Sequence, residues 1–361
     1  MSQHHAPDRF GVYIHIPFCH HRCDYCSFAT WTDRHHVIDQ YMNALVTDIG
    51  RNVAAGMPSV DTVFVGGGTP TLVPPAALMA CLSELPLVPG AEVTVECNPD
   101  DVTDAMMSTY FDGGVNRISM GVQSMTTHVL ASLGRTHNPA NVQRAIESVR
   151  GSGIPALNLD LIYGAVGETL DDWRYTVEQA VELSPTHVSA YGLTVEPGTP
   201  LALEPHRHPD DDDQADKYII VDDILRSAGL ANYEISNWAI PGFECRHNLL
   251  YWRQGDYTGF GCAAHSHADG RRWWNVRTPE RYIEAVDTNS PTEASGETLD
   301  AVTRKREALE LSLRTCDGVP VGALDPKTLE GLVEVVGERI VLTQRGRLLG
   351  NEVSLRLAPH E

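Results

Sequence analysis

The sequence predicts an α/β protein built on a partial (β/α)6 barrel, with a small winged-helix-like domain at the C-terminus. Within the first 240 residues, short segments rich in β-branched and aromatic residues alternate with helix-like stretches, which is typical of right-handed βαβ units around a parallel sheet. Six main strands are too few to close an eight-stranded barrel. Glycine and polar residues follow the strands, and in parallel barrels this edge binds the ligand.

The strands and helices are expected in regular order. We expect main strands at residues 12–16, 62–65, 92–97, 117–121, 156–163 and 187–193, and a short one at 233–236. We expect helices at residues 37–53, from Pro75 onward, and at 103–113, 138–151, 169–183 and 214–229. The acidic run at residues 210–213 is interpreted as a solvated loop rather than a metal site.

The chain is expected to divide into three parts: a barrel core at residues 1–240, a connecting segment at 241–297 and the winged-helix-like domain at 298–361. Between Asn237 and Arg281 lie four of the six tryptophans, six arginines and only four acids. Aromatic planes, guanidinium groups and histidines suit a flat, carboxylated tetrapyrrole. An aromatic plug that packs the open barrel is the alternative.

Charge and composition exclude several classes of protein. The net charge is −21, from 48 acids against 27 lysines and arginines, so we expect no nucleic-acid partner. No apolar run approaches the ~20 residues of a membrane helix, and residues 1–10 lack the apolar core of a signal peptide. Of the eight cysteines, three are clustered and five are scattered along the chain, which suits a reducing compartment. We expect a cytoplasmic protein without an integral membrane segment, and leave peripheral membrane association open.

Three cysteines follow the first strand, with the spacing C-x3-C-x2-C: Cys19, Cys23 and Cys26. Cysteines this close on one loop can bind three irons of a [4Fe–4S] cluster and leave the fourth iron open. A zinc site completed by His15, His20 or His21 is the alternative. Zinc sites usually take a second ligand pair from further along the chain, and the next cysteine, Cys81, stands alone in an apolar stretch. We therefore interpret the three cysteines as cluster ligands.

This spacing resembles that of the radical-SAM enzymes, in which S-adenosylmethionine (SAM) chelates the open iron and is cleaved reductively to a 5′-deoxyadenosyl radical. The wider string Tyr-Ile-His-Ile-Pro-Phe-Cys at residues 13–19 resembles more narrowly the group that contains the oxygen-independent coproporphyrinogen III dehydrogenase and the haem chaperones. The resemblance extends over nearly the whole chain. It implies a radical-SAM barrel, with a [4Fe–4S] cluster and SAM as cofactors.

The resemblance also implies which residues bind SAM. The glycine-rich string at residues 66–70 resembles the motif whose backbone contacts the methionine amino group, and Glu96 resembles the glutamate that positions SAM. Without the resemblance, the glycines would fit any strand-to-helix turn, and Glu96 would fit a turn cap. The implied SAM-binding residues are Tyr13, Tyr25, Gly67, Gly68, Thr69, Glu96, Gln123, Arg135, Asp160 and Gly192.

Two departures distinguish this chain from the dehydrogenase. The dehydrogenase carries a fourth cysteine two residues after the third, where this chain has Phe28. It also has a longer segment before the cluster, whereas only eighteen residues precede Cys19 here. Conversely, the string His-Asn-Leu-Leu-Tyr-Trp at residues 247–252 resembles the H-N-x-x-Y-W motif of the haem chaperones, whose histidine is implicated in holding haem.

The sequence therefore predicts a radical-SAM-type haem chaperone that binds a [4Fe–4S] cluster, SAM and haem and delivers haem to apo-haemoproteins. We assign no catalytic residue and expect no coproporphyrinogen dehydrogenase activity. That dehydrogenase, which acts in porphyrin biosynthesis by oxidative decarboxylation, is the alternative, and a radical-SAM RNA modifier is disfavoured by the charge.

Among the histidines, we choose His247 as the axial or attachment residue for haem, because neutral imidazole is a good iron ligand and arginines flank it. A structural role is the competing interpretation, in which His247 forms a hydrogen bond to the segment that carries Tyr251. In that case His265 or His267 is the next candidate.

Overall fold

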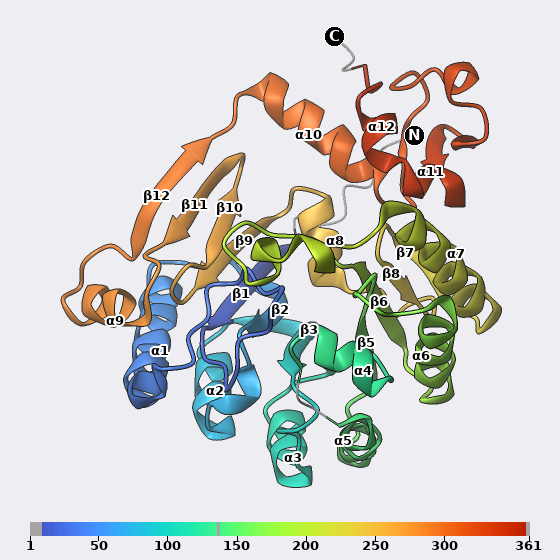
Figure 1. Ribbon diagram of the computed structural model, residues 1–361. Helices are drawn as coiled ribbons and strands as arrows, with labels where there is room; N and C mark the ends of the chain where they lie inside the picture. The colour runs from blue at the N-terminus through green and yellow to red at the C-terminus, as the bar shows by residue number, and fades with distance from the viewer. Residues whose placement is uncertain (1–8, 136–137, 359–361) are drawn as a thin grey trace.

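A computed structural model describes residues 9–135 and 138–358 of the chain. Residues 1–8, which fall in the stretch where we expect no signal peptide, lie outside these ranges. At the centre of the molecule, six parallel strands lie side by side in chain order (Figure 1), so the six main strands expected from the sequence are all present. They are β1 (Phe10–Ile16), β2 (Val60–Gly67), β3 (Leu87–Cys97), β4 (Arg117–Gln123), β5 (Ala156–Tyr163) and β6 (His187–Gly192).

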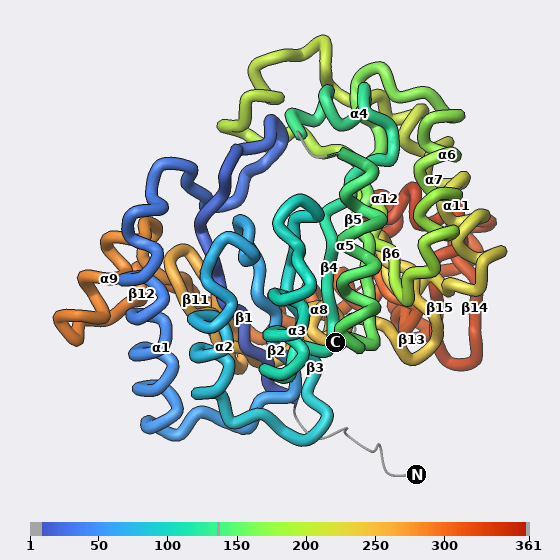
Figure 2. Tube along the Cα trace, turned by 90° about the horizontal axis from the view of Figure 1, so that it is seen from below, coloured from blue at the N-terminus to red at the C-terminus, as the bar shows by residue number. Residues whose placement is uncertain are grey.

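Helices connect these strands and cover the outer side of the curved sheet (Figure 1), and Figure 2 shows them following one another around the strands. They are α1 (Ile38–Ala54), α2 (Pro75–Ser83), α3 (Asp104–Asp112), α4 (Thr127–Ser132), α5 (Pro139–Ser152), α6 (Leu170–Glu182) and α7 (Asp211–Ser227). Short 3-10 turns lie at η1 (His35–Val37), η2 (Pro70–Leu72), η3 (Leu201–Leu203) and η4 (Pro205–Arg207). Only α4 was not expected, because six residues are too few to show a helical repeat.

Three helices begin at residues that the sequence indicated. The side chains of Thr103 and Asn138 accept hydrogen bonds from backbone N–H groups in the first turns of α3 and α5. Thr169 and Asp172 form a capping box at the start of α6. Because the first N–H groups of a helix have no partner within the helix, these side chains determine where each helix begins.

Further strands extend the parallel core at both edges, so that the described residues contain a twelve-stranded sheet. Next to β6 lie β8 (Asn237–Ala239) and β7 (Ala231–Glu234), and next to β1 lie β9 (Asp256–Phe260), β10 (His265–Ala268), β11 (Arg271–Asn275) and β12 (Glu293–Thr298). The strand β9 is parallel to β1, whereas β10, β11 and β12 continue the sheet in antiparallel pairs.

The four strands β9 to β12 lie in the connecting segment expected at residues 241–297, with β12 ending one residue beyond it, and the sequence indicated no strand there. All six residues of β12 are exposed, and β9 to β11 carry glycine, histidine and arginine where a half-buried strand would alternate apolar and polar residues. The same segment contains α8 (Arg246–Trp252) and α9 (Pro279–Asp287). The helix α9 lies beside α1 (Figure 1), and the Tyr282 hydroxyl donates a 2.6 Å hydrogen bond to Asp48.

The C-terminal elements form a small unit with its own apolar core, which includes Leu313, Leu329 and Ile340. They are α10 (Ala301–Leu313), β13 (Val319–Pro320), η5 (Pro326–Leu329), β14 (Val333–Val336), β15 (Arg339–Leu342), α11 (Gln344–Leu348) and α12 (Gly350–Ser354). The leading helix, the strand pair and the helical end are as expected from the sequence, but the second helix expected near Leu329 is only the 3-10 turn η5, and β13 precedes it. No helix among residues 9–135 and 138–358 is both long and apolar enough to cross a bilayer.

The acidic run at residues 210–213 corrects an expectation, because it is helical rather than a solvated loop. Asp210 is the N-cap of α7, and its carboxylate accepts a 2.9 Å hydrogen bond from the backbone N–H of Asp213. The following aspartates form the first turn of α7. Carboxylates are favoured there because the N-terminus of a helix carries a partial positive charge.

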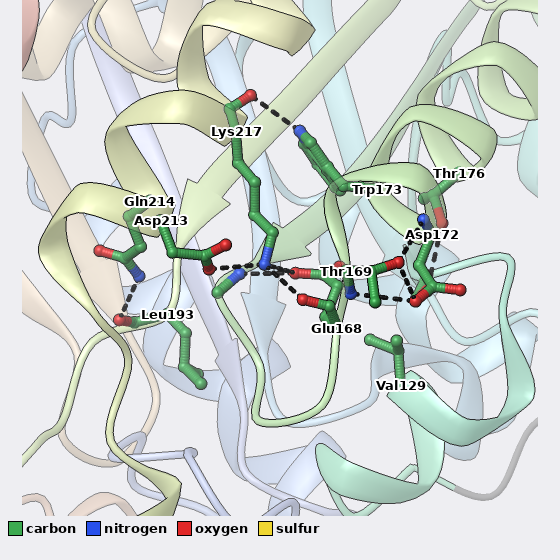
Figure 3. Close-up of polar contacts among 12 residues, drawn as sticks. Val129, Glu168, Thr169, Asp172, Trp173, Thr176, Leu193, Asp213, Gln214 and Lys217 are labelled. Carbon is green, nitrogen blue, oxygen red and sulfur yellow. Dashed lines mark hydrogen bonds and ion pairs between the residues drawn. The ribbon is translucent and has the colours of Figure 1, made fainter.

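One of these aspartates pairs with Lys217, whose side chain is fully buried (Figure 3). The Lys217 ammonium lies 2.6 Å from Asp213 and 3.0 Å from Glu168, and it donates a hydrogen bond to the Glu168 carbonyl oxygen. The Glu168 carboxylate also accepts a 2.7 Å hydrogen bond from the backbone N–H of Gly164. Lys217 therefore fixes the turn that follows β5, at the carboxyl end of the sheet.

We predict that Lys217→Met destabilises the protein by about 3–5 kcal/mol, because breaking a buried ion pair leaves an uncompensated charge. Burial raises the pKa of Glu168 and Lys217 lowers it, so the carboxylate loses its stabilising partner. Urea denaturation measures the free energy of unfolding. The double variant Lys217→Met, Glu168→Gln should recover part of the loss.

The matched control is Lys305→Met, which removes an exposed lysine from α10. A Lys217→Met variant as stable as this control would contradict the role given to the buried ammonium.

Candidate functional site

The carboxyl ends of the six parallel strands surround a cavity of about 480 Å³. All three cysteines of the C-x3-C-x2-C motif line it. Of the eleven residues predicted to bind SAM or haem, nine also line it: Tyr25, Gly67, Gly68, Thr69, Glu96, Gln123, Arg135, Asp160 and Gly192. Six strands thus bring to one site residues that lie far apart in the sequence.

A second cavity of about 820 Å³ adjoins the first. The two cavities share wall residues, among them Phe28, Gly67, Glu96 and Asp160. Tyr13 lines this second cavity, whereas His247 lines neither. The strands β9 to β11 contribute to its wall, so the extension of the sheet beyond β1 shapes this cavity.

The cysteine loop, residues 19–26, is held in place by backbone hydrogen bonds at its base. The N–H of Cys19 donates to the carbonyl oxygen of Trp31 (3.1 Å), and the N–H of Trp31 donates to Pro17 (2.8 Å). Further along the loop, Asp24 forms a 2.7 Å ion pair with Arg207. Arg207 could not have been identified from the sequence, because 183 residues separate it from Asp24.

Hydrogen-bond donors point at the cysteine sulfur atoms. The Thr69 hydroxyl lies 3.6 Å from the Cys19 sulfur, and an Arg135 N–H lies 3.5 Å from the Cys23 sulfur. Burial raises the pKa of the Cys19 and Cys26 thiols, whereas coordination to a metal removes the thiol proton outright. Donors of this kind stabilise thiolate sulfur, the form that binds iron.

The residues present suit a [4Fe–4S] cluster. Among the described residues, no group of three or more His, Cys, Asp and Glu side chains converges on a point where a single metal ion could bind. A cubane cluster makes a different demand, because each thiolate binds a different iron atom. The three cysteines meet that demand by lining one cavity together.

The glycine loop, residues 66–69, packs directly against the cysteine loop. The N–H of Gly68 donates to the Ile16 carbonyl oxygen (2.7 Å), and the N–H of Thr69 donates to Phe18 (2.8 Å). A Cβ atom on Gly68 would lie 2.6 Å from the Phe18 carbonyl oxygen. Gly67 has a φ of 108°, where side chains are strained. Close packing therefore requires glycine at both positions.

Two carboxyl groups lie in the wall shared by the cavities. Burial and, to a smaller extent, the nearby Asp160 raise the pKa of Glu96, while a hydrogen bond from the N–H of Gly67 opposes the shift, and the resulting pKa is about 8. Burial also raises the pKa of Asp160, against hydrogen bonds that include one from the Ser119 hydroxyl at 2.8 Å. The Glu96 carboxyl is therefore mostly protonated at pH 7.

Gln123 and Gly192 lie at the ends of β4 and β6, whereas Tyr25 lies in the cysteine loop and Arg135 follows α4. Gln123 ends β4 with a φ of 63°, a left-handed conformation that turns the chain at the cavity wall. Arg135 donates a 3.0 Å hydrogen bond to the Gly121 carbonyl oxygen and reaches Cys23 with its other nitrogen. Tyr25 lies close enough to Cys23 and Arg135 for their charges to affect its pKa, which burial raises.

His15 is a site residue that the sequence indicated only as an alternative zinc ligand. One ring nitrogen lies 2.9 Å from the Tyr13 hydroxyl, and the other lies 2.9 Å from the Ala29 carbonyl oxygen. His15 therefore connects β1 to the segment that follows the cysteines. A lone histidine in an apolar strand gives no sequence signal for such a contact.

His247 is fully buried in α8, and protein groups engage both of its ring nitrogens. Nδ1 lies 2.9 Å from the Thr62 hydroxyl, and Nε2 lies 2.7 Å from the Tyr251 hydroxyl. The Glu92 carboxylate accepts the backbone N–H of His247 at 3.0 Å, and burial lowers the pKa of His247 to about 3. This geometry corresponds to the structural role that the sequence left as the competing interpretation.

Comparison with known proteins finds relatives in the families that the sequence resembles. Residues 13–180 match the model of the Radical SAM superfamily. The chain is 41% identical to the heme chaperone HemW of Mycobacterium tuberculosis over 95% of this chain and 93% of that protein. It is 36% identical to the heme chaperone HemW of Escherichia coli K12, over 95% and 96% of the two chains.

Among solved structures, the fold is similar to that of coproporphyrinogen III oxidase (HemN) from Escherichia coli, described as a radical SAM enzyme, with a TM-score of 0.84. The match covers 96% of this chain and 89% of the other, at 24% sequence identity. At this identity the likeness establishes the shared α/β fold, including the large and mostly parallel sheet.

We predict that replacing Cys19, Cys23 or Cys26 by alanine abolishes a [4Fe–4S] cluster after anaerobic reconstitution with iron and sulfide. Each variant would lose one of the three thiolates that line the cavity. Visible absorption and EPR of the reduced protein report the cluster. Cys316→Ala, which changes an exposed cysteine, serves as the control, and a triple variant that still assembles a full cluster would refute the assignment.

A second prediction concerns pH. The pKa of Glu96 is about 8 in the folded protein and about 4.3 in an unfolded chain, so between these values only the folded state holds the proton. The free energy of unfolding should therefore fall as pH rises from about 4.5 to about 8, by up to about 1.4 kcal/mol per pH unit, relative to Glu96→Gln.

Urea denaturation of the cluster-free protein at several pH values measures this difference, and the Asp160 contribution largely cancels because both variants retain that residue. Parallel stability curves for wild type and Glu96→Gln would show that Glu96 titrates as it does in water.

Proposed function

The chain belongs to the haem chaperone HemW family within the radical SAM superfamily, and from this premise we propose that it binds haem and delivers it to apo-haemoproteins. The observation that carries the proposal is the likeness, over 95% of the chain, to relatives named heme chaperone in several bacteria. This span includes the barrel core and the segment of α8 to β12.

The cavity at the strand ends supports the cofactor part of the proposal. Cys19, Cys23 and Cys26 would hold a [4Fe–4S] cluster through three of its irons, leaving the fourth for SAM. SAM bound to such a cluster supplies reductive radical chemistry. The backbone of the glycine loop and the neutral carboxyl of Glu96 would bind and orient the polar groups of SAM, and Arg135 would stabilise the thiolate of Cys23.

Phe28 favours a chaperone over a coproporphyrinogen dehydrogenase. It stands where the dehydrogenase pattern has a fourth cysteine, its side chain is 60% exposed, and it lines both cavities. An exposed aromatic side chain in a cavity wall offers an apolar contact to a flat ligand. It provides no thiol chemistry.

The proposed partners and compartment follow from the same function. Apo-haemoproteins are the clients, and the cytoplasm is the compartment, because all eight cysteines of the chain are free of disulfides and an oxygen-sensitive cluster requires reducing conditions. The net charge of −21 disfavours a nucleic-acid partner. Peripheral contact with a membrane is compatible with this proposal.

The experiment is an anaerobic haem titration and transfer assay on the reconstituted full chain. We expect the protein to bind haem and to convert added apomyoglobin to its haem-bound form. With SAM, reductant and coproporphyrinogen III, we expect no protoporphyrinogen. Multiple turnovers of coproporphyrinogen, or failure to bind haem at all, would overturn the chaperone proposal.

A further inference from the structure

The cavity of about 820 Å³ contains a histidine whose ring nitrogens are unoccupied. Three histidines line it, and two of them, His15 and His187, have both ring nitrogens within hydrogen-bond distance of protein groups. The imidazole ring of His265 has no hydrogen-bond partner within the described part of the chain, and the residue is exposed. Partial burial against the cavity wall lowers its pKa, which favours the neutral imidazole.

The two other histidines considered as haem ligands are both engaged. His247 contacts Thr62 and Tyr251 through its ring nitrogens and lies outside both cavities. His267 lies 3.0 Å from the Gly255 carbonyl oxygen through Nδ1, and its Nε2 accepts the N–H of Gly270. An axial ligand needs a ring nitrogen with a free lone pair, and His265 meets this requirement.

The register of the strands places aromatic rings on the same face as His265. His265 pairs with Trp274 across β10 and β11, and their rings stack with centroids 5.6 Å apart. His267, two residues after His265 on β10, pairs with Tyr257 on β9, so Tyr257 also lies on this face. Both aromatic residues line the cavity, as does the exposed Phe28.

Two arginines of this wall, Arg117 and Arg277, have no ion-pair partner within the described residues, but Arg117 is buried and donates a hydrogen bond to the Phe243 carbonyl oxygen. Within the segment of α8 to β12, Arg253, Arg271 and Arg272 pair with carboxylates, whereas Arg277 is exposed, lines the cavity and has no ion-pair partner among the described residues. Guanidinium groups bind carboxylates in a bidentate geometry. Cavities of roughly 300–1,000 Å³ hold drug-sized ligands, so this one has room for a flat macrocycle.

We propose that His265 is the axial ligand of haem in this cavity, with Trp274, Tyr257 and Phe28 contacting the macrocycle and Arg277 binding a propionate. This inference rests on the proposed function and adds the site to it. Because Glu96 and Asp160 lie in the wall that both cavities share, haem bound here lies next to the cavity of the three cysteines. His247 then serves to position α8 against β2.

The test is a haem titration of the full-length protein, followed by the Soret difference spectrum and by EPR of the ferric haem. We expect His265→Ala to weaken haem affinity at least tenfold and to shift the Soret band, and added imidazole to restore the spectrum. Arg277→Gln should weaken affinity several-fold without moving the Soret band. His206→Ala, an exposed histidine outside both cavities, is the matched control and should bind as wild type.

A further variant separates His265 from His247 without removing either residue. Thr62→Val removes the hydrogen-bond partner of His247 Nδ1 at a residue that lines neither cavity, so haem affinity should rise if His247 is the ligand and stay unchanged if His265 is. Wild-type affinity and spectrum in His265→Ala would overturn the inference and leave the chaperone proposal standing. Absence of haem binding to the wild-type protein would overturn both.

Discussion

The contact between the glycine loop and the cysteine loop is the constraint on which the site depends. Two backbone hydrogen bonds, from Gly68 to Ile16 and from Thr69 to Phe18, join the ends of β2 and β1. They place the Thr69 hydroxyl at the Cys19 sulfur. A side chain at Gly68 would collide with the Phe18 carbonyl oxygen, so the backbones can approach this closely only without a Cβ atom there. The position of the cysteines is therefore determined by backbone geometry more than by side-chain packing.

The position of β1 explains why two cavities share a wall. This strand lies between β2, which leads into the glycine loop, and β9, which begins the antiparallel extension. The cysteine loop consequently faces the proposed cofactors, whereas of the residues that follow it Phe28 lines both cavities and Ala29 lines the larger one. A sheet that ended at β1 would lack Tyr257, His265 and Trp274. The extension thus adds a candidate haem site to a barrel that the family uses for SAM.

Much of this arrangement was predictable from the sequence, because its signals are local. Alternating strands and helices predicted the barrel, and nine of the implied cofactor residues line one cavity. The strands β9 to β12 were missed because exposed and glycine-rich strands show no two-residue apolar repeat. Arg207, Lys217 and His247 each contact a residue that is far away in the chain. A single sequence does not reveal such contacts.

Hydrogen–deuterium exchange of the anaerobically reconstituted protein, with and without haem, tests the proposed haem site in the larger cavity most directly. If haem binds between the antiparallel extension and the cysteine segment, protection should concentrate in β9 to β11 and in residues 26–31, because bound haem would restrict local opening there. The C-terminal unit from α10 to α12 should exchange unchanged. Protection confined to that unit, or centred on α8 without β10, would contradict a haem site in the barrel.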